Sequence, residues 1–328
     1  MATKAGPGRA DREGISLLEF LQTYPTDKAA ERWFAEQRWP SGVCCPQCGS
    51  LDVQTGCQHK TMPYRCREKA CGRPRFSVKT GTVMECSNLG YQTWLTAMFL
   101  VLSNLKGVSS MKLHRDLRVT QKSAWFLAHR LRAALTTSGT LYVGPVEVDE
   151  TYFGGKRKNM PKHKRAQLTG RGASGKSAVV GAKDRDSKQV TAGAVPDTKA
   201  DTLRGFATAA AAPGATVYTD DATAYDGLPR QRTSVKHSAG EYVRGQAHIN
   251  GIESFWSLLK RGYIGIYHKF SPKHLDRYVQ EFTGRHNIRD LDTADQLLTV
   301  GRSMAGKRLT YRRLIAKNGL PSGARAAA

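Results

Sequence analysis

Acidic residues are scarce in this sequence. Its 328 residues include 51 Lys and Arg but only 27 Asp and Glu, which gives a formal net charge of +24 and an isoelectric point of about 10.0. This imbalance is hard to explain for an enzyme that acts on small metabolites, and it is typical of proteins that neutralise phosphates. The composition therefore favours a nucleic acid as the partner over the alternative of a generally basic protein.

Long hydrophobic runs are also absent. The longest apolar stretch, from Trp94 to Leu105, is much shorter than the roughly 20 residues that a membrane-spanning helix needs, and Ser103 and Asn104 interrupt it. The first residues lack the hydrophobic segment of a signal peptide. We therefore expect a cytoplasmic, nucleoid-associated protein without a membrane partner. Disulfides are rare in that compartment, so the seven cysteines are expected to be metal ligands or free thiols.

Four cysteines form two pairs that are typical of a zinc ribbon. Cys45 and Cys48 belong to a Cys-Pro-Gln-Cys-Gly turn, and Cys66 and Cys71 follow with a wider spacing and another glycine. Two such turns between short strands can present four thiolates tetrahedrally to Zn²⁺. We predict that these four residues bind a structural Zn²⁺, and the alternative is a set of buried free thiols.

Other residues nearby could compete for this metal. Cys44 directly precedes Cys45, but the Cys-Pro-x-Cys-Gly register favours Cys45. Cys57 and His59 stand alone, and lone residues of this kind are more often incidental. Cys86 is expected to be a thiol without a role.

The next segment predicts a helix-turn-helix. The pattern indicates a helix through Met111–Leu117, a turn at Arg118–Thr120 and a second helix from about Gln121, with Thr120 as its N-cap. An apolar stripe on the second helix leaves four polar side chains on other faces: Gln121, Lys122, His129 and Arg130. A DNA-reading helix has this pattern. An ordinary packed helical hairpin is the alternative.

The remainder of the chain has an α/β pattern. Strands are expected at Tyr142–Asp149, Ser177–Ala182, Gln189–Val195 and Thr216–Thr219, with a helix before the last strand and an amphipathic helix (INGIESFWSLLKRGY) after it. Strands in hairpin order followed by helix, strand and helix match an RNase H-like layout. We therefore predict an α/β RNase H-like catalytic core with an N-terminal zinc ribbon and a helix-turn-helix-like segment. The expected division is a tail with short helices (1–40), the zinc ribbon (41–86), the helix-turn-helix-like segment (87–140), the catalytic domain (141–290) and a basic helical tail with a disordered end (291–328).

Three acidic positions in the α/β region suit a two-metal site. Asp149 lies in an apolar run (YVGPVEVDETYFGG), Asp220 ends a second one (ATVYTDD), and Glu253 opens the amphipathic helix that carries Lys260 two turns later. Two Mg²⁺ or Mn²⁺ ions about 4 Å apart need carboxylates that converge from separate elements. An aspartate inside an apolar strand is costly without a partner, so Asp149 is the hardest of the three to explain as a surface residue.

A strongly basic segment follows the first acid. Residues 155–176 contain eight Lys or Arg and no acid. The simpler interpretation is a solvated loop. Because the segment directly follows the strand with Asp149, we favour a loop that contacts DNA and is mobile without it.

The motifs together resemble the bacterial insertion-sequence transposases of the 1595 type, the ISXO-like DDE transposase family. The resemblance covers most of the chain and rests on WPSGVCCPQCGS, CGRPRFSVKTGTVMECSNL, VEVDETYFGGKRK, YTDDATAY and HINGIESFWSLLKRGYIGIYHKFS. The last three are the most specific. Carried over by position, the acidic triad of the family falls on Asp149, Asp220 and Glu253, and its accompanying lysine falls on Lys260.

Two ligand assignments have neighbours that could replace them. Asp221 follows Asp220 where the family often has glycine, but alternation along a strand sends only one of the two to the site, and we choose Asp220. Asn250 lies one turn before Glu253, and some relatives have asparagine as the third ligand, but Glu253 keeps the seven-residue spacing to the lysine.

Three aromatic or imidazole side chains lie close to these acids in the sequence. His248 and His268 flank the amphipathic helix and could orient a phosphate or a water, although a packed or exposed histidine is the simpler interpretation. Trp256 faces a different side from the third acid and is expected in the core.

The resemblance implies a reaction. A transposase of this family cuts the ends of its element with water and then joins the freed 3′-hydroxyl to double-stranded target DNA by two-metal phosphoryl transfer. Bringing two DNA ends together implies a homo-oligomer on DNA. The alternatives are a catalytically inactive DNA-binding protein derived from a transposase and an RNase H-like nuclease that does not join strands.

Overall fold

The computed structural model describes residues 13–136, 139–155, 157–166, 168, 174–235 and 248–322. The expected disordered end lies mostly outside the described residues, as do most of the N-terminal tail and part of the basic segment 155–176. The described residues divide into two compact units. Unit 1 comprises residues 13–135 and 288–316, and unit 2 comprises residues 136–287 and 317–322. The expected tail therefore divides between the two units.

Unit 1 combines a small antiparallel sheet with a helical core. The sheet has the order β1 (Val53–Gln54), β2 (Tyr64–Cys66), β3 (Arg75–Phe76). The helices are α1 (Leu17–Thr23), α2 (Asp27–Arg38), α3 (Tyr91–Ser103), α4 (Ser110–Leu117), α5 (Gln121–Leu135), α10 (Thr293–Ser303) and α11 (Tyr311–Ile315). Apolar side chains from the N-terminal helices and from α10 share one core, which includes Trp94, Leu127 and Leu297.

The helix-turn-helix elements lie where the sequence predicts them. The turn contains Arg118 in a left-handed conformation (φ 51°), and the hydroxyl of Thr120 accepts a hydrogen bond from the amide of Ser123 at 3.1 Å. Gln121 and Lys122 are exposed at the start of α5, as expected. His129 and Arg130, which the prediction placed on faces other than the apolar stripe, are both buried and are not available for the DNA contact that a DNA-reading helix would make.

The burial of Arg130 has a cause that is distant in the sequence. Its Nε donates to the carbonyl of Leu309 at 3.1 Å, and its guanidinium lies 4.1 Å from the centre of the Phe126 ring. The C-terminal part of unit 1 therefore packs against the later turns of α5. Only the start of that helix remains available to a DNA groove.

Unit 2 contains a five-stranded mixed sheet. Its strands are β4 (Val146–Phe153), β5 (Ser177–Asp184), β6 (Val190–Val195), β7 (Thr216–Asp220) and β8 (Gln231–Val235), in the order β6-β5-β4-β7-β8. The first three strands pair antiparallel, and β7 and β8 continue the sheet in parallel with β4. Two details differ from the prediction. The first strand begins at Val146, after Pro145, and the polar edge strand β8 has no counterpart in the prediction.

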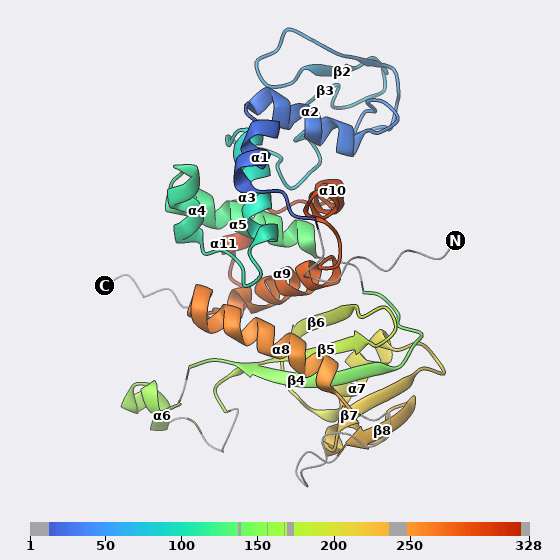
Figure 1. Cartoon of the computed structure of the whole chain (residues 1–328), viewed down its shortest axis with the longest axis vertical. Helices are drawn as coiled ribbons and strands as arrows, with labels where there is room; N and C mark the ends of the chain where they lie inside the picture. The colour runs from blue at the N-terminus through green and yellow to red at the C-terminus, as the bar shows by residue number, and fades with distance from the viewer. Residues whose placement is uncertain are drawn as a thin grey trace. The chain divides into compact units, whose positions relative to one another are not determined.

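Helices cover both faces of this sheet (Figure 1). α7 (Ala200–Ala210) packs on one face, and α8 (Asn250–Gly262) and α9 (Leu275–Asn287) pack on the other. A π-helical turn, η4 (Tyr263–Tyr267), extends α8. Within the segment expected to be a mobile loop, the described residues include two short helices, η1 (Arg157–Asn159) and α6 (Lys162–Ala166). The remaining short helices are η2 (Thr223–Tyr225) and η5 (Pro272–His274).

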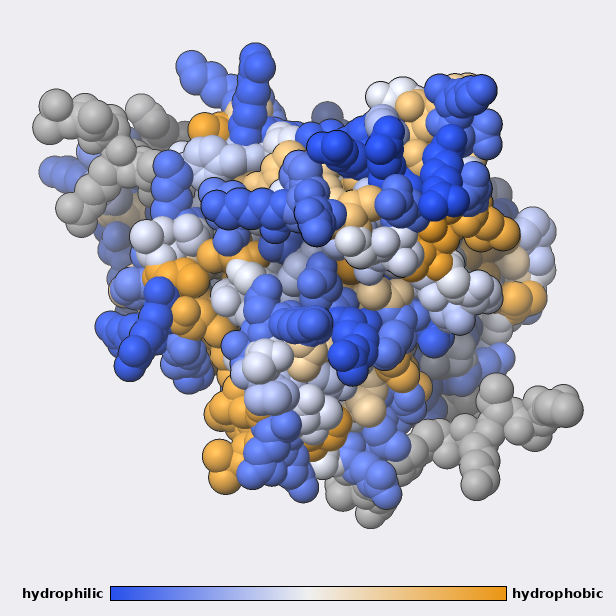
Figure 2. Space-filling view, turned by 90° about the horizontal axis from the view of Figure 1, so that it is seen from above, coloured by the Kyte–Doolittle hydropathy of each residue, from blue (hydrophilic) through white to orange (hydrophobic). Residues whose placement is uncertain are grey.

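Hydrophilic side chains dominate the face of the molecule seen in Figure 2, and apolar side chains form smaller areas between them. No helix among the described residues is long and apolar enough to cross a membrane.

Candidate active site and metal centre

Asp149 lies in the middle of β4 and is held by a tryptophan of α8. Its Oδ2 accepts a hydrogen bond from Nε1 of Trp256 at 3.0 Å. Gly181 of β5 is the cross-strand partner of Asp149, and a Cβ atom on Gly181 would stand 2.6 Å from Cη2 of Trp256. The absence of a side chain at this position therefore makes room for the indole. Trp256 is buried as expected, but the sequence gave no indication of its bond to Asp149.

Asp220 ends the neighbouring strand. β4 and β7 run parallel with Glu147 opposite Tyr218, and counting two residues along each strand brings Asp220 beside Asp149 on the same face. Oδ1 of Asp220 accepts the amide of Ala222 at 3.2 Å. Asp221 lies after the last residue of β7 and is exposed, so strand alternation places only Asp220 on the face of Asp149.

Glu253 and Lys260 are exposed on α8 and line one cleft with Asp149. This cleft, called the α8 cleft below, has a volume of about 380 Å³. Its lining consists of Asp149, Glu150, Thr151, Glu253, Trp256, Ser257, Lys260, Arg261 and Ile264. Asp220 is not among the lining residues. Strand and helix thus bring together three of the four residues predicted for the catalytic site, and the fourth approaches from the adjacent strand.

Negative charge is concentrated at the base of the α8 cleft. Burial raises the pKa of Asp149 to about 7, and the charges of Glu150 and Asp220 add to this rise. Burial also raises the pKa of Glu150, whose Oε2 accepts the hydroxyl proton of Tyr225 at 2.8 Å. Buried carboxylates that destabilise one another fit a divalent cation, which would compensate their charge.

The acids do not stand at mutual ligand distances. Among the described residues, the only group of three or more Asp, Glu, His or Cys with all ligand atoms within 4.8 Å of one another is the cysteine cluster.

Sequence reasoning missed several residues around this site. Glu147 and Glu150 belong to the same strand as Asp149, and Tyr225 and Arg185 contact them. The signal was present in the run VEVDE, where two further acids interrupt an otherwise apolar strand.

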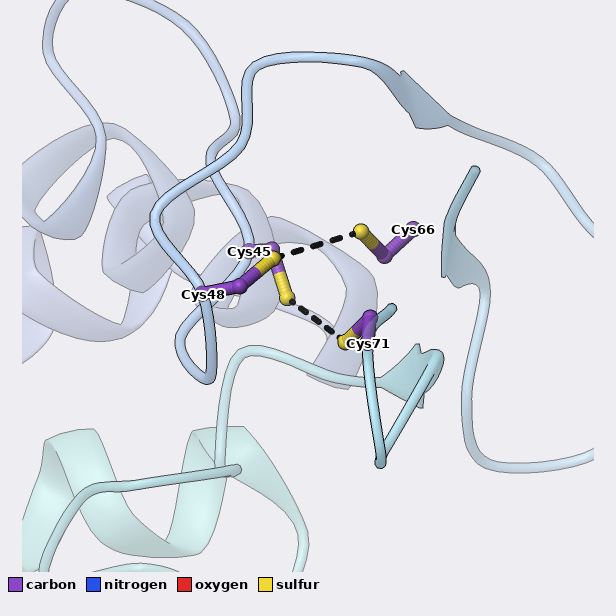
Figure 3. Close-up of side chains that lie close together, drawn as sticks. All are labelled: Cys45, Cys48, Cys66 and Cys71. Carbon is purple, nitrogen blue, oxygen red and sulfur yellow. Dashed lines mark hydrogen bonds between the residues drawn. The ribbon is translucent and has the colours of Figure 1, made fainter. Parts of the chain in front are cut away.

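The four predicted zinc ligands converge in unit 1 (Figure 3). The sulfur of Cys45 lies 3.7 Å from that of Cys71, and the sulfur of Cys48 lies 3.6 Å from that of Cys66. Tetrahedral Zn²⁺ with Zn–S bonds of about 2.3 Å requires sulfur atoms about 3.8 Å apart. Both distances are close to this value, and all four sulfur atoms lie within 4.8 Å of one another, so the cluster could hold Zn²⁺.

The first ligand turn is preorganised for a thiolate. Gly49 closes the turn with a positive φ of 77°, and its amide donates to the carbonyl of Cys45 at 2.9 Å. Although burial raises the pKa of the Cys45 thiol, hydrogen bonds from the amides of Cys48 and Gln47 lower it to about 7. The pKa of Cys66, by contrast, is raised to about 12 by burial, so Cys45 is the ligand of this group that loses its proton most readily.

The competing candidates lie outside these clusters. Cys44, Cys57 and Cys86 do not belong to the sulfur group, and Nδ1 of His59 accepts hydrogen bonds from the amides of Thr61 and Met62. His268 is exposed, with Nδ1 2.8 Å from the carbonyl of Ile264.

The comparisons with known proteins agree with these motifs. Residues 142–287 match the profile of the ISXO2-like transposase domain of the IS1595 type. The chain is also 29% identical over 283 residues to an uncharacterized protein in transposable element ISH50 of Halobacterium salinarum, which covers 82% of this chain and 93% of that relative. These matches confirm the resemblance to IS1595-type, ISXO2-like transposases that was inferred from the motifs.

Proposed function

We propose that this protein is a DDE transposase that cuts the ends of its element and joins the freed 3′-hydroxyl to target DNA. The observation that carries the proposal is the α8 cleft, which the half-buried Asp149 lines together with Glu253 and Lys260 while Asp220 adds its charge from the neighbouring strand. Carboxylates that converge from two strands and a helix suit two-metal phosphoryl transfer.

We infer that unit 2 has an RNase H-like fold. Three antiparallel strands followed by two parallel ones, with helices on both faces, support this assignment. The first two acids then lie on the adjacent strands β4 and β7, and the third lies on the helix that crosses them.

The acids are proposed as ligands of Mg²⁺ or Mn²⁺. Bound there, such ions activate the attacking oxygen and stabilise the leaving oxygen. The side chain of Lys260 is positioned to bind a phosphate of the same strand, because it lines the cleft two turns after Glu253. Trp256 holds Asp149 toward the cleft. We propose Zn²⁺ as the structural metal of the cysteine cluster.

Double-stranded DNA is the proposed partner. The net charge of +24 and the exposed start of α5 with Gln121 and Lys122 support a DNA-binding role for unit 1. We propose that the basic segment 155–176 contacts DNA near the α8 cleft and that two DNA ends are held by a homo-oligomer.

The first prediction concerns Asp149→Asn. Loss of this charge removes a ligand common to both reaction steps, so we expect cleavage and joining to be abolished while DNA binding stays nearly unchanged. The measurement is a strand-transfer assay with the purified full chain, Mg²⁺ or Mn²⁺, and the DNA ends that flank its own gene.

The matched control is Asp201→Asn, since Asp201 is an exposed acid in the first turn of α7. It should retain full activity. Wild-type cleavage by Asp149→Asn would contradict the proposed site. Zinc-loaded wild-type protein that binds the ends without cleaving them would indicate a DNA-binding derivative, and cleavage without joining would indicate a nuclease.

A further inference from the structure

Helix α8 begins without a capping side chain of its own. Its N-cap residue is Ile249, whose side chain offers no hydrogen-bond acceptor. The amide of Ile252 in the first turn donates instead to Oε2 of Glu147 at 2.9 Å. A carboxylate at this end also interacts favourably with the helix dipole. The cap of α8 is therefore supplied by strand β4.

Glu147 is buried and is paired from both sides. Its Oε1 accepts a hydrogen bond from Nε of Arg185 at 2.8 Å and lies 3.3 Å from Nδ1 of His248. The guanidinium of Arg185 also donates to the carbonyl of His248 and lies 4.0 Å from the centre of the Tyr218 ring. These contacts hold the buried carboxylate in one position. Its charge is compensated by Arg185, and removing that partner would leave a buried charge unpaired.

Two further contacts fix the same turn of the helix. Nζ of Lys183 donates to the carbonyl of Gly251 at 3.1 Å. A Cβ atom on Gly251 would stand 2.6 Å from Oε2 of Glu147. The helix can approach the carboxylate this closely because residue 251 is glycine, and β4 and β5 together hold the start of α8.

The contact between Glu147 and the amide of Ile252 lies between two of the proposed catalytic acids. Glu147 precedes Asp149 by two residues on the same strand face, a separation of about 7 Å, and its bonding partner Ile252 directly precedes Glu253. We propose that Glu147 is a positioning residue that sets the distance between Asp149 and Glu253. This inference rests on the proposed function, in which these two acids act on one phosphate.

The test uses Glu147→Ala and Glu147→Gln in the full-length protein. The first readout is amide hydrogen exchange in residues 249–258 of the metal-free protein. We expect Glu147→Ala to raise exchange at the start of α8 about tenfold or more, because a hydrogen bond to a charged group is lost. Glu147→Gln should produce a smaller rise, because the amide keeps an acceptor for Ile252 but loses the charge that pairs with Arg185.

The second readout is DNA cleavage at saturating Mg²⁺. Displacing a reacting group by about 1 Å costs on the order of 100-fold in rate, and we expect a loss of this size in Glu147→Ala with DNA binding unchanged. Glu147→Gln should retain an intermediate rate. It also keeps the test open if the alanine variant fails to fold.

A matched control separates positioning from general stability. Glu281→Gln removes another buried carboxylate of unit 2, whose partners include Arg285 at 3.6 Å and the hydroxyl of Tyr267 at 2.7 Å. It should lower the melting temperature without raising exchange at the start of α8. Folded Glu147 variants with wild-type exchange there, or with wild-type cleavage, would overturn the inference. If the Glu147 variants show raised exchange but the wild-type protein never cleaves DNA, the contact between Glu147 and the start of α8 is supported and the proposed function is contradicted.

Discussion

The hydrogen bond between Trp256 and Asp149 is possible because residue 181 is glycine. The indole occupies the space above Gly181 and donates to the carboxylate from there. This hydrogen bond lowers the pKa of Asp149 against the larger effect of burial, which raises it. One glycine on β5 thus influences how readily the first acid of the site is ionised.

We predict that Gly181→Ala destabilises unit 2 by about 1–3 kcal/mol, because the new methyl group overlaps the indole in a packed core. Urea unfolding of the metal-free protein measures the change. The matched control is Gly205→Ala on the exposed face of α7, where a Cβ atom has no neighbour within 4 Å. It should leave stability unchanged or raise it by up to about 1 kcal/mol, because alanine favours helix. Equal stability of the two variants would contradict the packing argument.

Among the elements, the small sheet of unit 1 has very short strands, and its aromatic contacts are limited to Trp39, Tyr64 and Phe76. Strands β1, β2 and β3 contain two or three residues each, too few to be stable without a further constraint. The four cysteine sulfurs bring together the turn before β1 (Cys45 and Cys48), the end of β2 (Cys66) and the loop before β3 (Cys71). The metal is therefore expected to determine whether this sheet forms.

We predict that Cys66→Ser removes Zn²⁺ from the purified protein and lowers the stability of unit 1, since three remaining thiolates bind the ion weakly. Metal analysis of the protein and a thermal melt provide the measurements. Cys57→Ser is the control, because Cys57 lies outside the sulfur group, and this variant should keep about one Zn²⁺ per chain. Equal zinc content in both variants would exclude the proposed ligand set.

The local sequence pattern was sufficient to predict most helices and strands, but not the contacts between them. The turn at Arg118 and the cap at Thr120 follow from neighbouring residues, and the structure contains both. The predicted acids were placed on the correct strand and helix for the same reason. The contact of Glu147 with the start of α8 and the space for the indole at Gly181 depend on how β4 pairs with β5 and how α8 packs on both strands. No single segment of the sequence encodes this arrangement. Strand β8 was missed because an edge strand can be polar.

At the scale of the whole molecule, the C-terminal segment of the chain completes the unit that the N-terminal segment begins. Leu297, Val300 and Met304 are buried in the core of unit 1. Nζ of Lys307 donates to the carbonyl of Ala134 at the end of α5 at 2.7 Å. The burial of Arg130 follows from the same packing, because its Nε donates to the carbonyl of Leu309, a contact that the local pattern of α5 could not predict.

We predict that a chain ending at Asn287 has an unstable unit 1. Each of the three buried side chains contributes about 1.5–3 kcal/mol, and their combined loss is comparable with the 5–15 kcal/mol that stabilises a typical domain. Limited proteolysis should cleave within residues 13–135 of the truncated protein. A chain ending at Ala316 retains the segment and should resist cleavage there; similar digestion of both chains would contradict the prediction.

Unit 1 is formed by two separate segments of the chain, and this has a consequence for its folding during synthesis on the ribosome. Domains generally fold as their residues emerge, the N-terminal ones first, but unit 1 begins first and lacks residues 288–316 until the segment that follows unit 2 has also been synthesised. Unit 2, encoded between its two parts, is synthesised before that segment emerges. Helix α5 therefore gains its full structural support only after residues 288–316 have been synthesised, so a chain that terminates before residue 288 would carry this helix without the segment that packs against it.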